Sequence, residues 1–461
     1  MEAVANRYIS LNKGVFMYLT KGKYNLMSEV KKEEECYQRF FTVNKTGEQL
    51  VKLISGNRTV EEVAELFCEK TGIPLEDNRE WIEQFLLELK ENDAVVLTET
   101  PVEQEKLKVI GDGALISPMI ATIEVTEKCN LRCKHCYLEA SCEKSSMITF
   151  EQFQWLVDIF KKNHVLNLEL TGGEIFVHPQ AYEILELALK QFATVAILTN
   201  GTMLSEKVLK LLKTYRDKIV LNISIDSTQP SVHDEFRGMK GAFEATCKNV
   251  KRMTEAGLRV RIASSIFRDN MWEIDKLAEL AISLGANMFV FNFIEDFGRG
   301  KLLEKSEKVE EELDAESYIR YVDGVIEKYQ KMIPIARSED KILGSENCGS
   351  AINSIIVGAD GNLRPCALFE KTNLFGNIFK EEFREIFQKD IYQKIAKILP
   401  PSEENGCPKN CEHFVNCKGC YFKGLSHNRG KEKVCSWIEK NNLYEILEIF
   451  ERGVRDVQPD K

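Results

Sequence analysis

The pattern of apolar and polar residues between positions 118 and 300 predicts strands and helices in alternation. Six apolar runs have the length of a buried strand, at 119–126, 165–171, 194–199, 219–226, 258–266 and 287–294. Segments with apolar residues at helical spacing lie between them, among others at 150–162, 204–215, 242–256 and 271–284. Near-continuous apolar strands are those buried on both faces, so the pattern predicts an α/β fold with a parallel sheet covered by helices.

Six such units in succession predict a partial (β/α)6 barrel of the TIM type over residues 118–300. In parallel barrels the reacting groups gather at the C-terminal ends of the strands. We therefore expect the site among the residues that directly follow the predicted strands.

The first hundred residues carry a different pattern, which predicts a separate α+β domain over residues 1–98. Short strand-like runs joined by turn-forming Asn12-Lys13-Gly14 and Lys21-Gly22 predict tight hairpins, with strands at 8–11, 15–19 and 23–27. Helical segments follow at 33–41, 45–54, 60–70 and 77–92, and a short strand at 94–97 ends the unit. Thr59 and Glu62 have the spacing of a capping box.

The remaining boundaries follow from composition. Residues 99–117 alternate in charge and contain Pro101, Gly111 and Gly113, which is typical of a linker. The charged segment 301–331 predicts a helix pair, which forms a helical bridge over residues 301–345. A cysteine-rich domain follows at 346–440 and contains an amphipathic helix at 383–399. The chain ends in a helix and tail at 441–461, and the apolar pattern of this helix begins near 439.

Composition limits the classes of function. A chain of 461 residues with 44% hydrophobic residues supports three domains. Its net charge of −10 disfavours nucleic acid as a partner. No stretch resembles a signal peptide or a membrane span, so we expect a cytoplasmic protein with no membrane partner. Fourteen cysteines in such a chain indicate metal binding rather than disulfides.

Cys129, Cys133 and Cys136 follow the first predicted strand in the stretch EVTEKCNLRCKHCYLEA. A loop with three thiolates can hold three irons of a [4Fe-4S] cluster and leave the fourth iron open. The ferredoxin patterns differ, because they supply enough thiolates to close their clusters. Zinc needs a fourth ligand, and His135 is a poor candidate because it directly precedes Cys136. Three unrelated core cysteines are the other alternative.

This arrangement resembles the radical S-adenosylmethionine (SAM) enzymes, whose signature is Cys-x3-Cys-x-aromatic-Cys. The resemblance implies that the open iron binds SAM and that reduction cleaves SAM to a 5′-deoxyadenosyl radical. His135 occupies the aromatic position of the signature, which the family places beside the adenine. The resemblance also implies a low-potential electron donor such as a flavodoxin or ferredoxin.

The second and third strands end in further candidate SAM contacts. Gly172, Gly173 and Glu174 follow the second strand, and the resemblance implies that this segment binds the SAM amino group. Glycine also permits a close approach of backbone to a ligand. Taken alone, the glycine pair is more typical of a turn. Asn200 ends the third strand, where a plain Asn-Gly turn is the alternative.

The fourth strand ends in Ser224 and Asp226, with Arg237 in the segment that follows. Alternation along a strand places Ser224 and Asp226 on one face. The resemblance implies contacts from these residues to the ribose and carboxylate of SAM. Asp226 is also suited to cap the turn after the strand.

Seven further cysteines lie between residues 348 and 435. They are Cys348, Cys366, Cys407, Cys411, Cys417, Cys420 and Cys435. Two zinc sites would use eight ligands rather than seven. The pattern resembles the SPASM extension of radical SAM enzymes, which carries two auxiliary [4Fe-4S] clusters. The central spacing departs from the family, with three, five and two intervening residues in place of two, five and three.

The resemblance implies a division of these cysteines between two clusters. The second auxiliary cluster would take Cys407, Cys411, Cys417 and Cys435, and the first would take Cys348, Cys366 and Cys420. Fully ligated relatives have an eighth cysteine shortly before the first of these, but residues 335–347 contain none. The first auxiliary cluster then has an iron that is open to a substrate thiolate, or that Glu346 or water fills. We expect the remaining Cys36, Cys68, Cys142 and Cys247 to be buried small apolar residues.

The N-terminal domain resembles the RiPP recognition element, a winged-helix-like domain similar to the small chaperone of pyrroloquinoline quinone biosynthesis. In that family a leader peptide adds as a strand beside the third strand and rests on a helix. A DNA-binding winged helix is the alternative, and the acidic residues throughout the helices of the unit argue against it.

Together the three parts resemble maturases of ribosomally made peptides of the sactipeptide and ranthipeptide type. The resemblance implies an oxidoreductase that joins a cysteine thiol of a precursor peptide to an unactivated carbon, as a thioether. Formation of a carbon–carbon or carbon–oxygen bond, side-chain oxidation and epimerisation remain alternatives within the class. An iron–sulfur electron-transfer or peptide-binding protein is the alternative from another class. No side chain stands out as a catalytic acid or base.

Overall fold

The computed structural model describes residues 2–20, 23–32, 35–111, 118–294, 296–307, 315–337, 348–369, 375–411, 417 and 419–455. The chain divides into two compact units, residues 1–117 and residues 118–461. No helix in the described ranges is long and apolar enough to cross a bilayer.

The N-terminal unit contains two sheets and a set of helices. One sheet has the strand order β4-β3-β2-β6 and consists of β2 (Phe16–Thr20), β3 (Lys23–Lys32), β4 (Glu35–Val43) and β6 (Lys108–Ile110). The other pairs β1 (Tyr8–Leu11) with β5 (Val95–Thr98). The helices are α1 (Glu2–Ala5), α2 (Lys45–Val51), α3 (Val60–Thr71) and α4 (Leu75–Glu91). The predicted capping box is confirmed, since the amide of Glu62 donates to Thr59 Oγ1 at 3.2 Å and the amide of Thr59 donates to Glu62 Oε2 at 2.8 Å.

Three predictions for this unit were wrong. The segment 33–41 was expected to be a helix, but residues 35–43 form β4, which pairs with β3 along its whole length. The first two strands were expected to form a hairpin, yet β1 pairs with β5 at the other end of the unit. Part of the expected linker is a strand, because Lys108–Ile110 pairs in parallel with β2. β1 and β6 each pair with a strand that is distant in sequence, whereas β4 pairs with β3, the strand directly before it.

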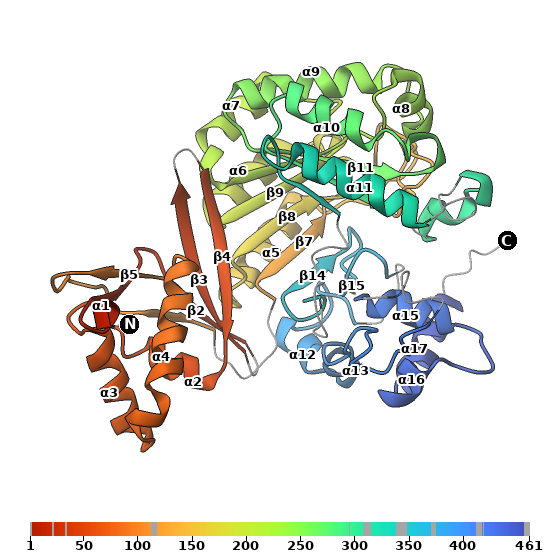
Figure 1. Cartoon of the computed structure of the whole chain (residues 1–461). Coiled ribbons are helices and arrows are strands. Elements are labelled where there is room, and N and C mark those ends of the chain that lie inside the picture. Colours follow the sequence, from red (N-terminus) through yellow and green to blue (C-terminus); the bar gives the residue numbers. More distant parts are fainter. Residues whose placement is uncertain are drawn as a thin grey trace. The chain divides into compact units, whose positions relative to one another are not determined.

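The second unit contains the predicted barrel strands. All six are confirmed, in chain order and mutually parallel, as β7 (Ile120–Glu124), β8 (Asn167–Thr171), β9 (Thr194–Thr199), β10 (Ile219–Ser224), β11 (Val260–Ile266) and β12 (Met288–Phe293). Figure 1 shows β7, β8 and β9 side by side. The helices between them are α5 (Phe150–Lys162), α6 (Ala181–Gln191), α7 (Glu206–Thr214), α8 (Pro230–Arg237), α9 (Ala242–Glu255) and α10 (Ile274–Ser283).

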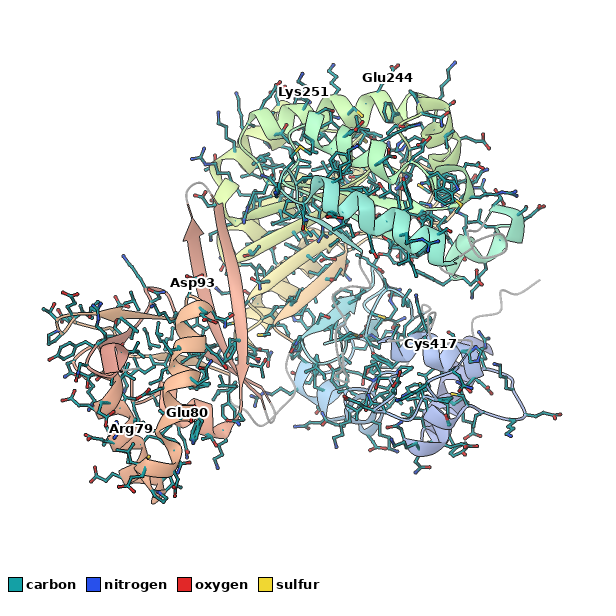
Figure 2. The ribbon with its side chains drawn as sticks, viewed as in Figure 1. Arg79, Glu80, Asp93, Glu244, Lys251 and Cys417 are labelled. Atoms are coloured by element: carbon teal, nitrogen blue, oxygen red, sulfur yellow. The ribbon has the colours of Figure 1, made fainter. Side chains whose placement is uncertain are left out.

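Helix α9 illustrates why these segments fold against the sheet. Thr246, Val250 and Met253 lie on one face and are buried. Glu244 and Lys251 lie on the opposite face and point away from the sheet (Figure 2). Burial of the apolar face therefore fixes the orientation of the helix, as the spacing of its apolar residues predicts.

The cysteine-rich segment extends the barrel sheet. Beyond β7, β14 (Ser354–Val357) pairs in parallel with β7, and β15 (Leu363–Arg364) pairs with β14 in an antiparallel hairpin. At the other edge, β13 (Ile335–Arg337) pairs in parallel with β12 and completes a sheet of nine strands. The described helices of this part are α11 (Ala315–Tyr329), α12 (Phe383–Gln388), α13 (Asp390–Ile395), α15 (Tyr421–Asn428), α16 (Ser436–Lys440) and α17 (Tyr444–Arg455).

Two of the helices predicted here are broken. The expected helix at 383–399 consists of α12 and α13, separated by Lys389 in an extended conformation (ψ 138°). The expected C-terminal helix is divided into α16 and α17, because Asn442 adopts a left-handed conformation with φ 50°. Of the expected helix pair in 301–331, α11 is present, and residues 308–314 lie outside the described ranges.

Candidate active site and auxiliary cluster sites

Cys129, Cys133 and Cys136 lie on the loop that leaves the C-terminal end of β7. Cys129 and Cys133 are buried and Cys136 is half-buried. Short bridges between Thr126 and Met147 and between Lys128 and Ser141 close the loop at its base. A small core packs beneath it, formed by Leu131, Leu138, Ala140 and Ala242. The structure thus brings the three predicted thiols together on one ordered loop.

Each of the three sulfurs accepts a hydrogen bond. The amide of Leu131 donates to Cys129 Sγ at 3.4 Å, and the amide of Ala140 donates to Cys136 Sγ at 3.4 Å. Arg237 Nη1 donates to Cys133 Sγ at 3.8 Å. Burial raises the pKa of the Cys129 thiol to about 12, and nearby Glu174 and the other two thiols add to the rise. A metal that binds here would displace the thiol protons.

The glycine pair after β8 is placed against this loop. A Cβ added at Gly172 would stand 2.4 Å from the carbonyl oxygen of Thr126, and one added at Gly173 would stand 2.3 Å from that of Lys128. The amide of Gly173 donates to the Thr126 carbonyl at 2.6 Å. Both glycines therefore allow the backbone after β8 to pack closely against the loop that carries Cys129, Cys133 and Cys136, called the cluster loop below. The sequence had suggested that they allow close approach to a ligand.

Glu174 is buried and holds the end of β9. Its Oε1 accepts from Thr199 Oγ1 at 2.8 Å and from the amide of Phe176 at 3.1 Å. Its Oε2 accepts from the amide of Asn200 at 2.8 Å. Burial raises the pKa of the Glu174 carboxyl despite these hydrogen bonds. The side chain of Asn200 in turn donates to Asn130 Oδ1 at 3.0 Å, which joins β9 to the cluster loop.

His135 lies in a stack of three rings. Its ring is 4.6 Å from that of Phe236 with an interplanar angle of 7°, and Phe236 stacks on Phe267 at 4.0 Å with the same angle. Nε2 of His135 is 3.2 Å from Ser265 Oγ. Nδ1 is buried and has no hydrogen-bonding partner among the described residues. Burial lowers the pKa of His135 to about 3, so the imidazole is neutral.

Asp226 and Arg237 form a buried ion pair at the end of β10. Arg237 Nε donates to Asp226 Oδ2 at 2.5 Å, and the amide of Ser265 donates to Asp226 Oδ1 at 2.9 Å. Burial alone would raise the pKa of Asp226, but Arg237 lowers it below its usual range. Ser224 is half-buried on β10. The candidate SAM contacts thus lie at the C-terminal ends of β8, β9 and β10 or in the segments that follow, with His135 on the loop after β7, and their role stays a prediction.

The other seven cysteines form two groups. The pKa of Cys366 rises to about 12, mainly through burial, with contributions from nearby Cys420 and Cys348. The pKa values of Cys407 and Cys417 rise to about 11 by burial and by the proximity of Cys435 and Cys411. Figure 2 labels Cys417 in this part of the chain. Cys420 also contributes to the raised pKa of Cys417, so it lies near cysteines of both groups, and the division of the ligands between two clusters stays a prediction. Glu346 lies outside the described residues.

Within the described residues, no three His, Cys, Asp or Glu side chains converge closely enough to surround a single metal ion. A [4Fe-4S] cube places each thiolate on a different iron, so its ligands lie further apart than the ligands of one zinc ion.

The remaining cysteines differ from one another. Cys68 is buried in the N-terminal core, as predicted, and Cys247 is half-buried. Cys142 is exposed, so the prediction that it is a core residue was wrong. The side chain of Cys36 lies outside the described part of the structure.

Family models match three successive parts of the chain. They are Coenzyme PQQ synthesis protein D (PqqD) at residues 23–95, the Radical SAM superfamily at 123–281 and the SPASM iron-sulfur cluster-binding domain at 348–421. The antilisterial bacteriocin subtilosin biosynthesis protein AlbA of Bacillus subtilis (strain 168) is 38% identical over 416 residues, which cover 89% of this chain and 91% of AlbA. The chain belongs to the radical SAM enzymes with a SPASM domain. Its cofactors are therefore a [4Fe-4S] cluster, SAM and auxiliary iron–sulfur clusters.

Two further comparisons extend over different lengths of this radical SAM chain. An AdoMet-dependent heme synthase of Methanosarcina barkeri is 28% identical over 330 residues, which cover 66% of the chain and 91% of the synthase. Crystal structures of Streptococcus suis SuiB share the fold of nearly the whole chain. SuiB bound to S-adenosylmethionine has a TM-score of 0.62 at 15% identity, covering 92% of this chain and 98% of SuiB. SuiB bound to precursor peptide SuiA has a TM-score of 0.60 at 14% identity, covering 93% and 98%.

One buried network of this radical SAM enzyme was missed from the sequence. Glu124, at the end of β7, forms an ion pair with Arg364 on β15, and Tyr137 donates to Glu124 Oε1 at 3.0 Å. Glu124 and Arg364 are 2% and 3% exposed, so the charges compensate each other away from water. Through Tyr137, which follows Cys136, and Arg364, which lies two positions before Cys366, the network links the segments of these two cysteines. The single charge of Glu124 within the apolar run of β7 was the available indication.

Proposed function

We propose that this radical SAM enzyme matures a ribosomally made precursor peptide by forming a thioether between a cysteine thiol and an unactivated carbon. The likeness to AlbA over 89% of the chain carries the proposal, because AlbA is by name a biosynthesis protein of a bacteriocin. The PqqD-like unit supports a leader peptide as partner. The heme synthase match covers a smaller share of the chain, 66%.

The residues at the barrel fit SAM. The buried and unpartnered Nδ1 of His135 offers a polar contact beside a stack of flat rings. Three buried thiols on one loop are the donor set of a cluster with an open iron. When bound, these cofactors supply a radical that removes a hydrogen atom from carbon and an acceptor for the remaining electron. We infer a low-potential flavodoxin or ferredoxin as the electron donor, and the cytoplasm as the location.

Thioether formation follows from the grouping of the auxiliary thiols. Cys348, Cys366 and Cys420 form a group of three, and the sequence from 335 to 347 contains no further cysteine. A cluster held by three thiolates has an iron that prefers a soft sulfur ligand. We infer that the substrate cysteine binds there as a thiolate. The product then lacks one hydrogen from the carbon and one from the sulfur.

The leader is expected to add to the edge of β4. Residues 24–27 of β3 pair with β4 on one side and with β2 on the other, so the third predicted strand has no free edge over this length. Among the described strands, β4 is at the edge of its sheet. The ring centroids of Phe41 on β4 and Phe85 on α4 are 6.4 Å apart, so α4 provides apolar surface next to that edge. An added strand gains backbone hydrogen bonds there and side-chain contacts from the helix.

The test uses the anaerobically reconstituted full chain, SAM, a strong reductant and a candidate precursor peptide, namely a short peptide that contains cysteine. We expect a product lighter by two hydrogens whose cysteine no longer reacts with an alkylating reagent. A matched peptide with that cysteine changed to Ser is expected to give deoxyadenosine without the mass loss, because an alkoxide is a harder and more basic ligand than a thiolate. A modified product with a free thiol would overturn the thioether assignment.

A further inference from the structure

The C-terminal end of α8 is attached to the cluster loop by its backbone. The amide of Arg132 donates to the carbonyl of Arg237 at 3.2 Å, and the amide of Lys134 donates to the carbonyl of Phe236 at 2.9 Å. Gly238 follows in a left-handed conformation with φ 70°, where an added Cβ would stand 2.6 Å from the carbonyl oxygen of Arg132. These contacts fix the backbone of Arg237 relative to the loop.

The guanidinium of Arg237 lies between a carboxylate and a sulfur. Nε donates to Asp226 Oδ2 at 2.5 Å, and Nη1 donates to Cys133 Sγ at 3.8 Å. The side chain of Arg237 is 9% exposed and that of Asp226 is fully buried. Arginine keeps its positive charge in proteins. Arg237 is therefore a cation held in a buried site by its contacts with Asp226 and Cys133.

The three thiols of the loop accept hydrogen bonds from different kinds of donor. Cys129 and Cys136 accept from the neutral backbone amides of Leu131 and Ala140. Cys133 accepts from the charged Arg237. A charged donor binds a thiolate more strongly than a neutral one.

We propose that Arg237 acts as a positioning residue for the cluster itself, donating to the Cys133 sulfur and thereby raising the reduction potential of the bound cluster. The inference rests on the assignment of Cys133 as a ligand and not on the identity of the peptide. Hydrogen bonds to cluster sulfurs and nearby charge set the potential of iron–sulfur clusters. Reduction adds a negative charge, so a buried cation close to a ligand sulfur favours the reduced state.

The test is a spectroscopic redox titration of reconstituted Arg237→Gln without SAM or peptide, following the electron paramagnetic resonance feature that changes when SAM is added afterwards. We expect the ratio of reduced to oxidised cluster at a fixed potential to fall at least about tenfold, which is about 59 mV for a one-electron couple. Arg237→Lys keeps a positive charge but not the two-armed donor, so we expect a smaller fall. Arg237→Lys also serves for the titration if Arg237→Gln does not retain iron.

The matched control is Arg299→Gln. Arg299 is a cation from the segment after β12 that contacts the same loop, but its Nε donates to the carbonyl of Cys133 at 2.8 Å and its Nη2 to that of Ala140 at 3.0 Å, and neither contact involves a sulfur. We expect its potential to change much less than that of Arg237→Gln. Equal changes of the reduction potential in both variants would mean that any nearby positive charge has the same effect and that the contact with Cys133 has no special role. An unchanged potential in Arg237→Gln with weakened SAM binding would make Arg237 a SAM contact only, and either outcome overturns the proposal.

Discussion

Gly173→Ala is the substitution that most sharply tests how β8 meets the cluster loop. The added Cβ would stand 2.3 Å from the carbonyl oxygen of Lys128 and 2.8 Å from that of Glu127, whereas ordinary contact begins at 3.4 Å. Both neighbours are backbone atoms, so neither can turn away as a side chain does. Overpacking of this kind costs about 1–3 kcal/mol. At the upper end, the equilibrium ratio of native to displaced loop positions falls roughly hundredfold.

The expected result is specific to the first cluster. Wild-type protein should carry about twelve irons as three clusters of four. Gly173→Ala should retain about eight, together with the auxiliary clusters. SAM cleavage without peptide should fall by a factor between about five and about one hundred, because each 1.36 kcal/mol corresponds to a factor of ten. Iron analysis and the yield of 5′-deoxyadenosine measure both effects.

Gly324→Ala is the matched control for this prediction. Gly324 lies within α11, and nothing stands within 4 Å of an added Cβ. Alanine is favoured over glycine inside a helix by about 1 kcal/mol, so iron content and SAM cleavage should match the wild type. If Gly173→Ala also keeps its full iron content and cleavage rate, the account of the glycine pair as a close-packed contact with the cluster loop is refuted.

Three further predictions concern the clusters, the leader and the buried ion pair. Replacing the three cysteines of the cluster loop by Ala should remove about a third of the iron and all SAM cleavage, and retained cleavage would contradict the assignment. Deleting residues 1–117 should abolish peptide modification but leave reductant-driven SAM cleavage measurable, whereas equal turnover of the peptide would assign the unit another task. Arg364→Met should lower the stability of the full chain by about 3–5 kcal/mol in urea unfolding, because Glu124 stays buried and charged. Adding Glu124→Gln should restore part of the loss, and an unchanged midpoint in Arg364→Met would argue against the pair.

The barrel was predictable from the sequence because its strands are short, rich in apolar residues and separated by amphipathic helices. Each of the six appears where the pattern places it. The segment that became β4 was not predictable in this way. Its charged residues favour a helix by local propensity, and only pairing with β3 makes it a strand.

The cysteine sites were predictable as groups but not as geometry. Spacing alone separates the loop with Cys129 from the later seven cysteines. It does not reveal that β14 joins β7, since β14 has four residues and its partner is more than two hundred positions away. Similarly, Arg237 follows a predicted strand, but its donation to Cys133 depends on the docking of α8 against the loop.

The most direct test of thioether formation follows isotopes through the reaction. A precursor peptide deuterated at carbon in every residue except cysteine is treated with the reconstituted enzyme in ordinary water. The account predicts that the peptide loses one deuterium and one protium, and that the deuterium appears in 5′-deoxyadenosine. A loss of two protiums with no deuterium in deoxyadenosine, as oxidation to a disulfide would give, contradicts it.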